Sequence, residues 1–166
     1  MWTLLGDPEL TIYTQKPQSI SNMQITHRYE DISWSFTYDD AKVCVMSRFD
    51  MGQSYYSVWD YYGIATFTLP SNEYLVTVTQ ANSMPYRTIF GNVVYLQNEK
   101  LSNNLNVLAE QVNIGSDVNS NRPQGPVVVE NGSSTISAEF GTTIYSDFEV
   151  KLGASLEING NCIITQ

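Results

Sequence analysis

The sequence predicts an all-β protein made of two differently patterned parts. Through the first 90 residues, short stretches alternate large apolar side chains with small or polar ones, and this period of two is that of a half-buried strand. Beyond Gly91 the aromatic residues become fewer, and Asn, Ser and Gly become common. Short runs of mainly apolar residues, which we call apolar pulses, recur there. No segment carries a convincing helical period. We therefore expect strands throughout, with a change of architecture near Phe90 and Gly91.

The clearest strand of the first part runs from Ile32 to Tyr38, where Trp34 and Phe36 share the bulky face. Six further strands are expected at Met23 to His27, Lys42 to Ser47, Tyr55 to Trp59, Ile64 to Leu69, Glu73 to Gln80 and Arg87 to Phe90. About seven strands in about 80 residues, with turn signals every 8–12 residues, is the spacing of an immunoglobulin-like β-sandwich. Residues 11–90 are therefore predicted to form that sandwich.

The second part, residues 91–166, shows apolar pulses with little between them. They lie at residues 93–96, 105–108, 112–114, 127–129, 135–136, 143–144, 148–150, 156–158 and 163–164. From Ile136 to Ile158 the spacing is about eight residues, with Gly141 and Gly153 expected in turns, which is typical of short strands that bury their faces only by stacking. We predict a small stacked-strand module, with Phe148, Val150, Leu156 and Ile158 facing inward; a second ordinary sandwich is the alternative.

Composition excludes several classes of function. The net charge is −9 and only 8 Lys and Arg are spread along the chain, so neither nucleic acid nor an acidic membrane surface is an expected partner. No stretch approaches the roughly 18 to 20 apolar residues of a membrane-spanning helix. The start lacks the layout of a signal peptide, so if the natural protein is secreted its export signal lies upstream.

The residues that carry covalent or metal chemistry are few. Cys44 and Cys162 do not define a disulfide framework, and whether they pair stays open. A Cys–His nucleophile would have to use His27, the only histidine, and the local signatures of such cysteines are missing. We expect no catalytic residue, no metal and no cofactor. Asp39, Asp40 and Asp50 suit Ca²⁺ as ligands, yet no metal-loop motif surrounds them and turn acids explain them as well.

One cluster of aromatic residues is a candidate ligand-binding platform. Its members crowd one predicted hairpin: Tyr55, Tyr56, Trp59, Tyr61 and Tyr62. Exposed aromatic side chains stack on sugar rings or form protein contacts, although alternation along a strand sends some of them into the core. The cluster supports an alternative function, a carbohydrate- or protein-binding β module.

Three phrases of the sequence carry a resemblance to a known family. A strand opens at Ala41-Lys42-Val43-Cys44-Val45, a glycine turn precedes the Ala65-Thr66-Phe67-Thr68-Leu69-Pro70 strand, and Val76 to Tyr86 reads VTVTQANSMPY. This order resembles the immunoglobulin-like domain that follows the catalytic domain in gingipain-type cysteine peptidases. Leu4 to Leu10, LLGDPEL, is similar to the end of that family's peptidase domain, although such a run is also an ordinary turn. The resemblance implies that residues 1–10 end an upstream peptidase domain and that its catalytic Cys and His lie outside this chain.

A second resemblance covers the tail. Ser146 to Ile158, SDFEVKLGASLEI, is similar to the closing phrase of tail modules in secreted or surface proteins of anaerobic bacteria, described as a stack of three coat-hanger-shaped strands. Together the two resemblances imply a non-catalytic C-terminal segment of a bacterial gingipain-like peptidase, extracellular or on the cell surface. Its expected partners are the upstream peptidase domain and a host or surface protein or glycan. An independent enzyme, the remaining alternative, would need a pocket that joins His27 to a cysteine.

Overall fold

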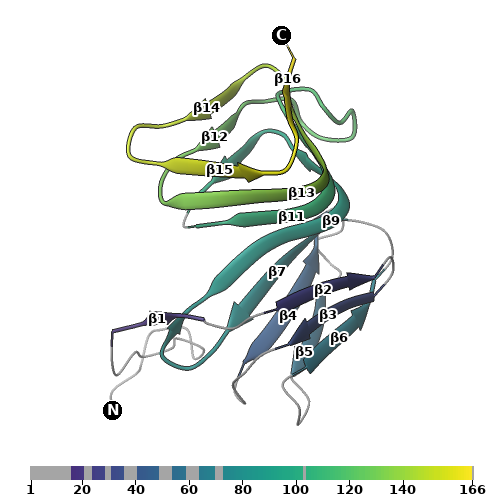
Figure 1. Ribbon diagram of the computed structural model, residues 1–166, viewed down its shortest axis with the longest axis vertical. Helices are drawn as coiled ribbons and strands as arrows, with labels where there is room; N and C mark the ends of the chain where they lie inside the picture. The colour runs from purple at the N-terminus through teal and green to yellow at the C-terminus, as the bar shows by residue number, and fades with distance from the viewer. Residues whose placement is uncertain are drawn as a thin grey trace, which may run out of the picture.

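The computed structural model shows an all-β protein, as the sequence predicts (Figure 1). It describes residues 16–20, 24–28, 31–35, 41–48, 54–58, 64–69, 73–102 and 104–165, with the backbone alone for 24–28, 31–35, 54–58 and 64–68. Every regular element among these residues is a strand.

The first part is a sandwich of two antiparallel layers (Figure 1). One layer has the order β2-β3-β6, with β2 at Gln24–Arg28, β3 at Asp31–Ser35 and β6 at Ile64–Thr68. The other has the order β5-β4-β7-β9, with β5 at Ser54–Val58, β4 at Lys42–Ser47, β7 at Glu73–Thr79 and β9 at Tyr86–Leu96. The short β1 (Gln18–Ser19) pairs with β8 (Ser83–Met84) beside them. The predicted all-β, sandwich-like fold is confirmed.

Side chains along each strand point alternately to its two faces, so every second residue can be buried in the sandwich core. On β4, Val43, Val45 and Ser47 are buried whereas Cys44 and Met46 are half-buried on the other face. The buried face belongs to a cluster of side chains from β4, β7 and β9 and their flanks: Ala41, Val43, Val45, Leu69, Tyr74, Val76, Val78 and Phe90. The predicted strand Lys42 to Ser47 has the observed bounds; Phe36 and Tyr38, expected to extend β3, lie outside the described residues.

The second part is a parallel β-solenoid. Its long sheet stacks β9, β11 (Asn106–Ile114), β13 (Ser133–Ile144) and then β15 (Ser155–Asn159) with β16 (Cys162–Ile164). Its short sheet stacks β10 (Glu99–Leu101), β12 (Val127–Val129) and β14 (Phe148–Val150). All these pairs are parallel, so the stacked module is confirmed and a second antiparallel sandwich is not what the tail forms.

The long solenoid strands bend in the middle, which corrects two details of the sequence prediction. The pulses at 105–108 and 112–114 belong largely to one strand, β11, and those at 135–136 and 143–144 to β13. Between Ala109 and Gln111 the register to β13 shifts, which is the irregularity of a β-bulge and bends the ladder. Gly141 therefore lies inside β13 with φ +127, not in a turn, whereas Gly153 lies in the expected turn.

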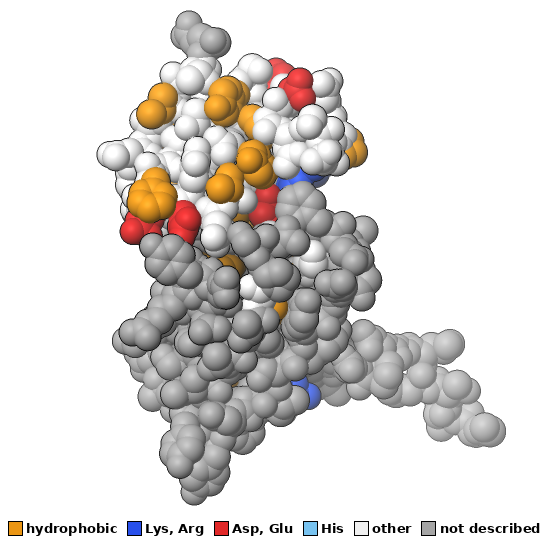
Figure 2. All heavy atoms as spheres, turned by 90° about the vertical axis from the view of Figure 1, so that its right-hand side faces the viewer, with side chains coloured by type: hydrophobic (Ala, Val, Ile, Leu, Met, Phe, Trp, Pro, Cys, Tyr) orange, Lys and Arg blue, Asp and Glu red, His pale blue; other side chains and the backbone are white. Residues whose placement is uncertain are grey.

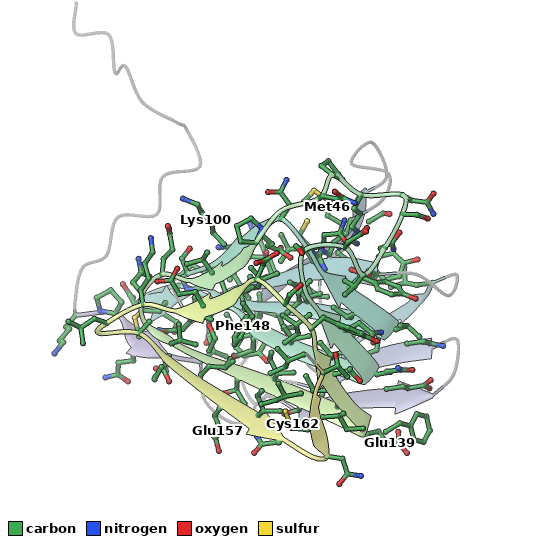
Figure 3. All side chains as sticks on the ribbon, turned by 90° about the horizontal axis from the view of Figure 1, so that it is seen from above. Met46, Lys100, Glu139, Phe148, Glu157 and Cys162 are labelled. Atoms are coloured by element: carbon green, nitrogen blue, oxygen red, sulfur yellow. The ribbon has the colours of Figure 1, made fainter. Side chains whose placement is uncertain are left out.

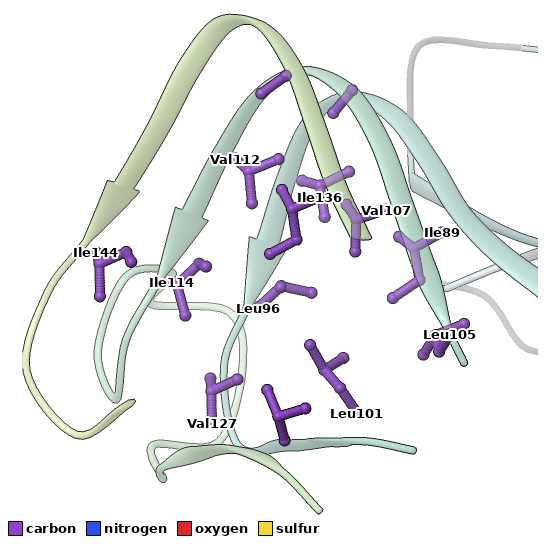
Figure 4. Close-up of a cluster of buried hydrophobic side chains, with 14 residues drawn as sticks. Ile89, Leu96, Leu101, Leu105, Val107, Val112, Ile114, Val127, Ile136 and Ile144 are labelled. Atoms are coloured by element: carbon purple, nitrogen blue, oxygen red, sulfur yellow. The ribbon is translucent and has the colours of Figure 1, made fainter. Parts of the chain in front are cut away.

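The inner faces of the solenoid form a column of aliphatic side chains (Figure 4). Ile89, Val107 and Ile136 are register partners on three successive strands, and each is 1 % exposed or less. Leu101 and Val127 close the column from the short sheet. The predicted inward residues Phe148, Leu156 and Ile158 pack against it, and Val150 pairs with the buried Val129.

One strand, β9, belongs to both parts. It pairs antiparallel with β7 along Tyr86 to Gly91 and parallel with β11 from Thr88 to Leu96. Ile89 faces the solenoid core and its neighbour Phe90 faces the sandwich core. The boundary expected between residues 90 and 91 thus falls inside a strand that is buried on both faces, and the predicted strand Arg87 to Phe90 is longer than expected.

Candidate functional site

A buried cluster of charged side chains lies where sandwich and solenoid meet. Glu73, the first residue of β7, is 1 % exposed. Its Oε2 accepts from Arg48 Nη1 at 2.5 Å and from Arg122 Nη2 at 2.8 Å, and its Oε1 accepts from the Tyr95 backbone N–H at 2.8 Å. Arg48 also donates to Glu99 at 2.6 Å. Donors from the sandwich and the solenoid therefore converge on one carboxylate.

A single glutamine holds the loop that delivers Arg122. Gln97, 4 % exposed, accepts at Oε1 from the backbone N–H groups of Val118 and Asn119 at 2.7 and 2.8 Å. Its Nε2 donates to the carbonyls of Asn119, Arg122 and Pro123 at 3.0 to 3.1 Å. Because the loop between β11 and β12 is fixed in this way, Arg122 also reaches the carbonyl of Tyr95.

This cluster suits a structural role. The Glu73 carboxylate accepts three hydrogen bonds, all from groups of the protein itself, so its contacts join elements of the fold. Buried charges of this kind are tolerated only when they are paired and hydrogen-bonded, and here the pairing spans four elements. We call Glu73, Arg48, Arg122 and Glu99 the junction cluster.

A concave surface that suits a ligand lies on the outer face of the solenoid, among the described residues. It is a groove of about 430 Å³, within the about 300–1,000 Å³ of small-molecule sites. Its floor is a ladder of register partners on four parallel strands, Phe90, Leu108, Ser137 and Asn159. The ladder is apolar next to the sandwich and polar toward the last strand, so one occupant meets both kinds of surface.

Two carboxylates line the groove at the bend of the long strands. Glu110 lies on β11 at the register shift, opposite Glu139 on β13. Viewed from above, Glu139 projects from the side of the stack (Figure 3). The face of the molecule on which the long strands bend carries acidic side chains next to exposed apolar ones (Figure 2). A groove that combines apolar, hydroxyl, amide and carboxylate groups can bind a polyhydroxylated ligand or an extended peptide.

The structure places the two cysteines on separate strands, β4 and β16. Cys44 is half-buried on β4, Cys162 is exposed on β16, and both thiols are free. His27 lies on β2, of which the backbone alone is described. Asp39, Asp40 and Asp50 lie outside the described residues, and in the part of the chain that is described no three His, Cys, Asp or Glu side chains gather as a metal site.

The aromatic platform stays a prediction. Tyr55 and Tyr56 lie on β5, opposite Val45 and Cys44 of β4, and only their backbone is described. Trp59, Tyr61 and Tyr62 lie outside the described residues. The described residues contain no helix long and apolar enough to cross a membrane.

Sequence reasoning missed both the junction cluster and the groove. Residues 48, 73 and 122 are far apart in the sequence; the register of β4 and β7 places Arg48 near Glu73, and the loop held by Gln97 adds Arg122. No local sequence pattern marked Arg48 or Glu73, because the position directly after a strand and the first position of another are ordinary places for charged residues. Comparison with family models, curated proteins and solved structures found no match to the chain.

Proposed function

We propose that this chain is a non-catalytic accessory segment of a secreted or cell-surface gingipain-like cysteine peptidase of a bacterium. In this role it supports the catalytic domain, spaces it from the surface or mediates adhesion. The observation that carries the proposal is the continuous sheet: β9 is shared by sandwich and solenoid, and the junction cluster ties their remaining elements together. A segment built this way holds what is attached to its two ends at a fixed separation and orientation.

Two of the phrases behind the family resemblances each contain a turn residue with positive φ. VTVTQANSMPY covers most of β7, the turn after it and the first residue of β9. Within it Asn82 has φ 57, a left-handed conformation that Asn adopts more readily than most residues. In the tail phrase, Gly153 has φ +89 between β14 and β15. The resemblance thus rests on turn residues with a physical role, which supports the proposal.

The first test attaches the chain behind a gingipain-type catalytic domain. We expect the catalytic domain to lose activity more slowly at elevated temperature with the chain attached than alone. A Glu73→Gln chain, which loosens the junction, should protect less. Equal inactivation rates in all three proteins would contradict a supporting role.

The second test concerns chemistry in the chain itself. We expect the purified chain to hydrolyse no peptide substrate, and Cys44→Ala, Cys162→Ala and His27→Ala to change stability alone. Turnover that any of these variants abolishes would instead identify an independent enzyme.

A carbohydrate- or protein-binding module is the second candidate, and the groove at Phe90, Leu108, Ser137 and Asn159 favours it. A glycan array probed with the wild-type chain tests it directly. Loss of a hit in Tyr55→Ala/Tyr56→Ala would assign binding to the aromatic hairpin, and loss in Glu110→Gln/Glu139→Gln would assign it to the groove. An array without hits would remove the carbohydrate form of this candidate.

A further inference from the structure

The far end of the solenoid is an open apolar column. Inward-facing positions of its last turn are register partners of core residues: Phe148 of Val127, Ile158 of Ile136 and Ile164 of Ile144. Yet Ile164 is 73 % exposed and Val150 41 %, although their partners Ile144 and Val129 are buried. Figure 2 shows exposed apolar side chains on the upper part of the molecule, which carries these strands. Solenoids cover such ends with a polar terminal repeat, and the described residues show none here.

The backbone at this end is also unpaired on one side. Strands β14, β15 and β16 each end their stack and have one neighbour among the described strands. Their outer N–H and C=O groups therefore form three open edges around the apolar column, and open edges are templates for pairing with another strand. An occupant that fits must supply strands on three sides and apolar side chains in the centre.

We propose that a second copy of this chain covers the open end, joined by a two-fold axis through the middle of β15. The last turn consists of β14, β15 and β16, and it climbs along the solenoid axis. Its end therefore lies above its beginning by about one strand spacing, ~4.8 Å. A two-fold through the middle strand sets the higher end of one copy against the lower beginning of the other, so all three edges meet at once.

The strand lengths and faces fit this arrangement. The axis pairs β15, five residues long, with itself, and pairs β14 of one copy with β16 of the other, each three residues long. All these contacts are antiparallel. Cys162 then lies opposite Val150 of the second copy and Ile164 opposite Phe148, so inward side chains meet inward side chains. The result is one continuous column through both copies, with the same interface patch on each as a two-fold dimer requires.

The size and the charge of the interface determine how strong the dimer is expected to be. About 17 residues of each copy, from Phe148 to Ile164, take part, against about 20–30 in a standard interface, so the dimer is concentration-dependent. Glu157, in the middle of β15, projects from the side of the stack (Figure 3), and the axis brings the two copies of it together. Like charges directly opposite on paired strands repel, which limits the affinity.

Sedimentation velocity of the full chain over a concentration series tests the proposal. We expect a monomer–dimer equilibrium that Ile164→Lys weakens by at least about tenfold, because a charge would enter the apolar column. Glu157→Gln should strengthen it. The matched control is Phe140→Lys, which replaces another apolar side chain, 69 % exposed, at the bend rather than at the end. A monomer at every concentration, or equal losses for Ile164→Lys and Phe140→Lys, would overturn the proposal.

Disulfide capture tests the geometry without relying on a disruptive variant. In a Cys44→Ala background, Val150→Cys should cross-link to Cys162 of the second copy on mild oxidation, because opposed residues of antiparallel strands lie about 4.5–5.5 Å apart between Cα atoms. The background chain alone should stay uncross-linked, since the two Cys162 residues lie on different sides of the column. Val93→Cys, on the first solenoid strand, is the control. Cross-linking in the control and not in Val150→Cys would refute the two-fold.

Discussion

Sandwich and solenoid share one sheet but bury opposite faces of it. On β4 and β7 the buried face carries Val45 and Val76, and across β9 it continues through Phe90. From β9 onward the other face is buried, through Ile89 and Val107. The exceptions mark the crossover: Leu75 packs against the solenoid core and Leu108 against the sandwich core. A chain can thus change architecture within one strand, without a linker, by changing which face it buries.

Sandwich and solenoid also differ in how their strands are connected. Antiparallel strands such as β2 and β3, or β4 and β5, pair with the next strand of the chain, whereas each parallel strand needs a connection that returns to the same end of the sheet. In the solenoid the short strands β10, β12 and β14 lie within those returns. Each solenoid turn therefore depends on its neighbours for burial.

The largest expected effect comes from removing the last solenoid turn by ending the chain after Gly153. Without β15 and β16, the buried Ile136 and Ile144 lose their register partners Ile158 and Ile164. We expect the remaining solenoid to become protease-sensitive while the sandwich stays folded. Limited proteolysis with mass spectrometry checks this: cleavage confined to residues after about 91 separates the two regions. Simultaneous digestion of both would show that β9 makes them a single cooperative unit.

The second-largest loss of stability is expected at the junction cluster, between sandwich and solenoid. Replacing Glu73 with Gln leaves Arg48 and Arg122 next to a neutral group, and breaking a buried ion pair by removing one partner costs about 3–5 kcal/mol. Urea unfolding measures this change in the free energy of unfolding. The matched control is Glu130→Gln, an exposed pair on the outer surface of the solenoid, for which we expect a much smaller, salt-sensitive loss. Equal losses in the two variants would mean that the junction cluster is no special coupling point.

The sequence predicts strands that are buried on one face better than strands that are buried on both. The bounds of β4 were predicted residue by residue because a strand with one buried face alternates visibly. The strand β11 was read as two apolar pulses because the polar Glu110 and Gln111 lie between them, and its bend was missed because no Gly or Pro marks it. The extent of β9 was missed because Thr88, Ile89 and Phe90 are all buried and do not alternate. Side-chain contacts such as Glu73 with Arg122 depend on tertiary register and left no local pattern.

A smaller loss of stability is expected from a change at the bend of β13, a feature that β4 and β7 do not share. Gly141 has φ +127, and a Cβ there would lie 3.0 Å from the carbonyl oxygen of Asn161. Gly141→Ala should therefore cost about 1–3 kcal/mol of backbone strain, with the contact added to it. Gly153→Ala is the matched control, because Gly153 also has positive φ but nothing lies within 4 Å of a Cβ there. Thermal unfolding of both variants compares them, and a larger loss at Gly153 would mean that the bend tolerates a side chain.

The smallest effect concerns the charges that join successive solenoid turns on the outer surface. Glu130 accepts from Lys100 at 2.9 Å and from Lys151 at 3.2 Å, one residue from each of the three short-strand turns. The hydrogen bond from Lys100 and then that from Lys151 hold the pKa of Glu130 below its ordinary value of 4.5.

A lowered folded-state pKa contributes stability that is present above the ordinary value and is lost as pH falls through the lowered one. The free energy of unfolding should therefore be higher for wild type than for Glu130→Gln at neutral pH, and the two values should converge as pH falls through the lowered pKa of Glu130. Lys100→Gln/Lys151→Gln should remove this pH-dependent difference, because it removes its cause, and 1 M salt should shrink it by screening exposed charges. A difference that persists unchanged in acid would mean that Glu130 acts through packing, and that the solenoid surface, unlike the junction, owes nothing to its ion pairs.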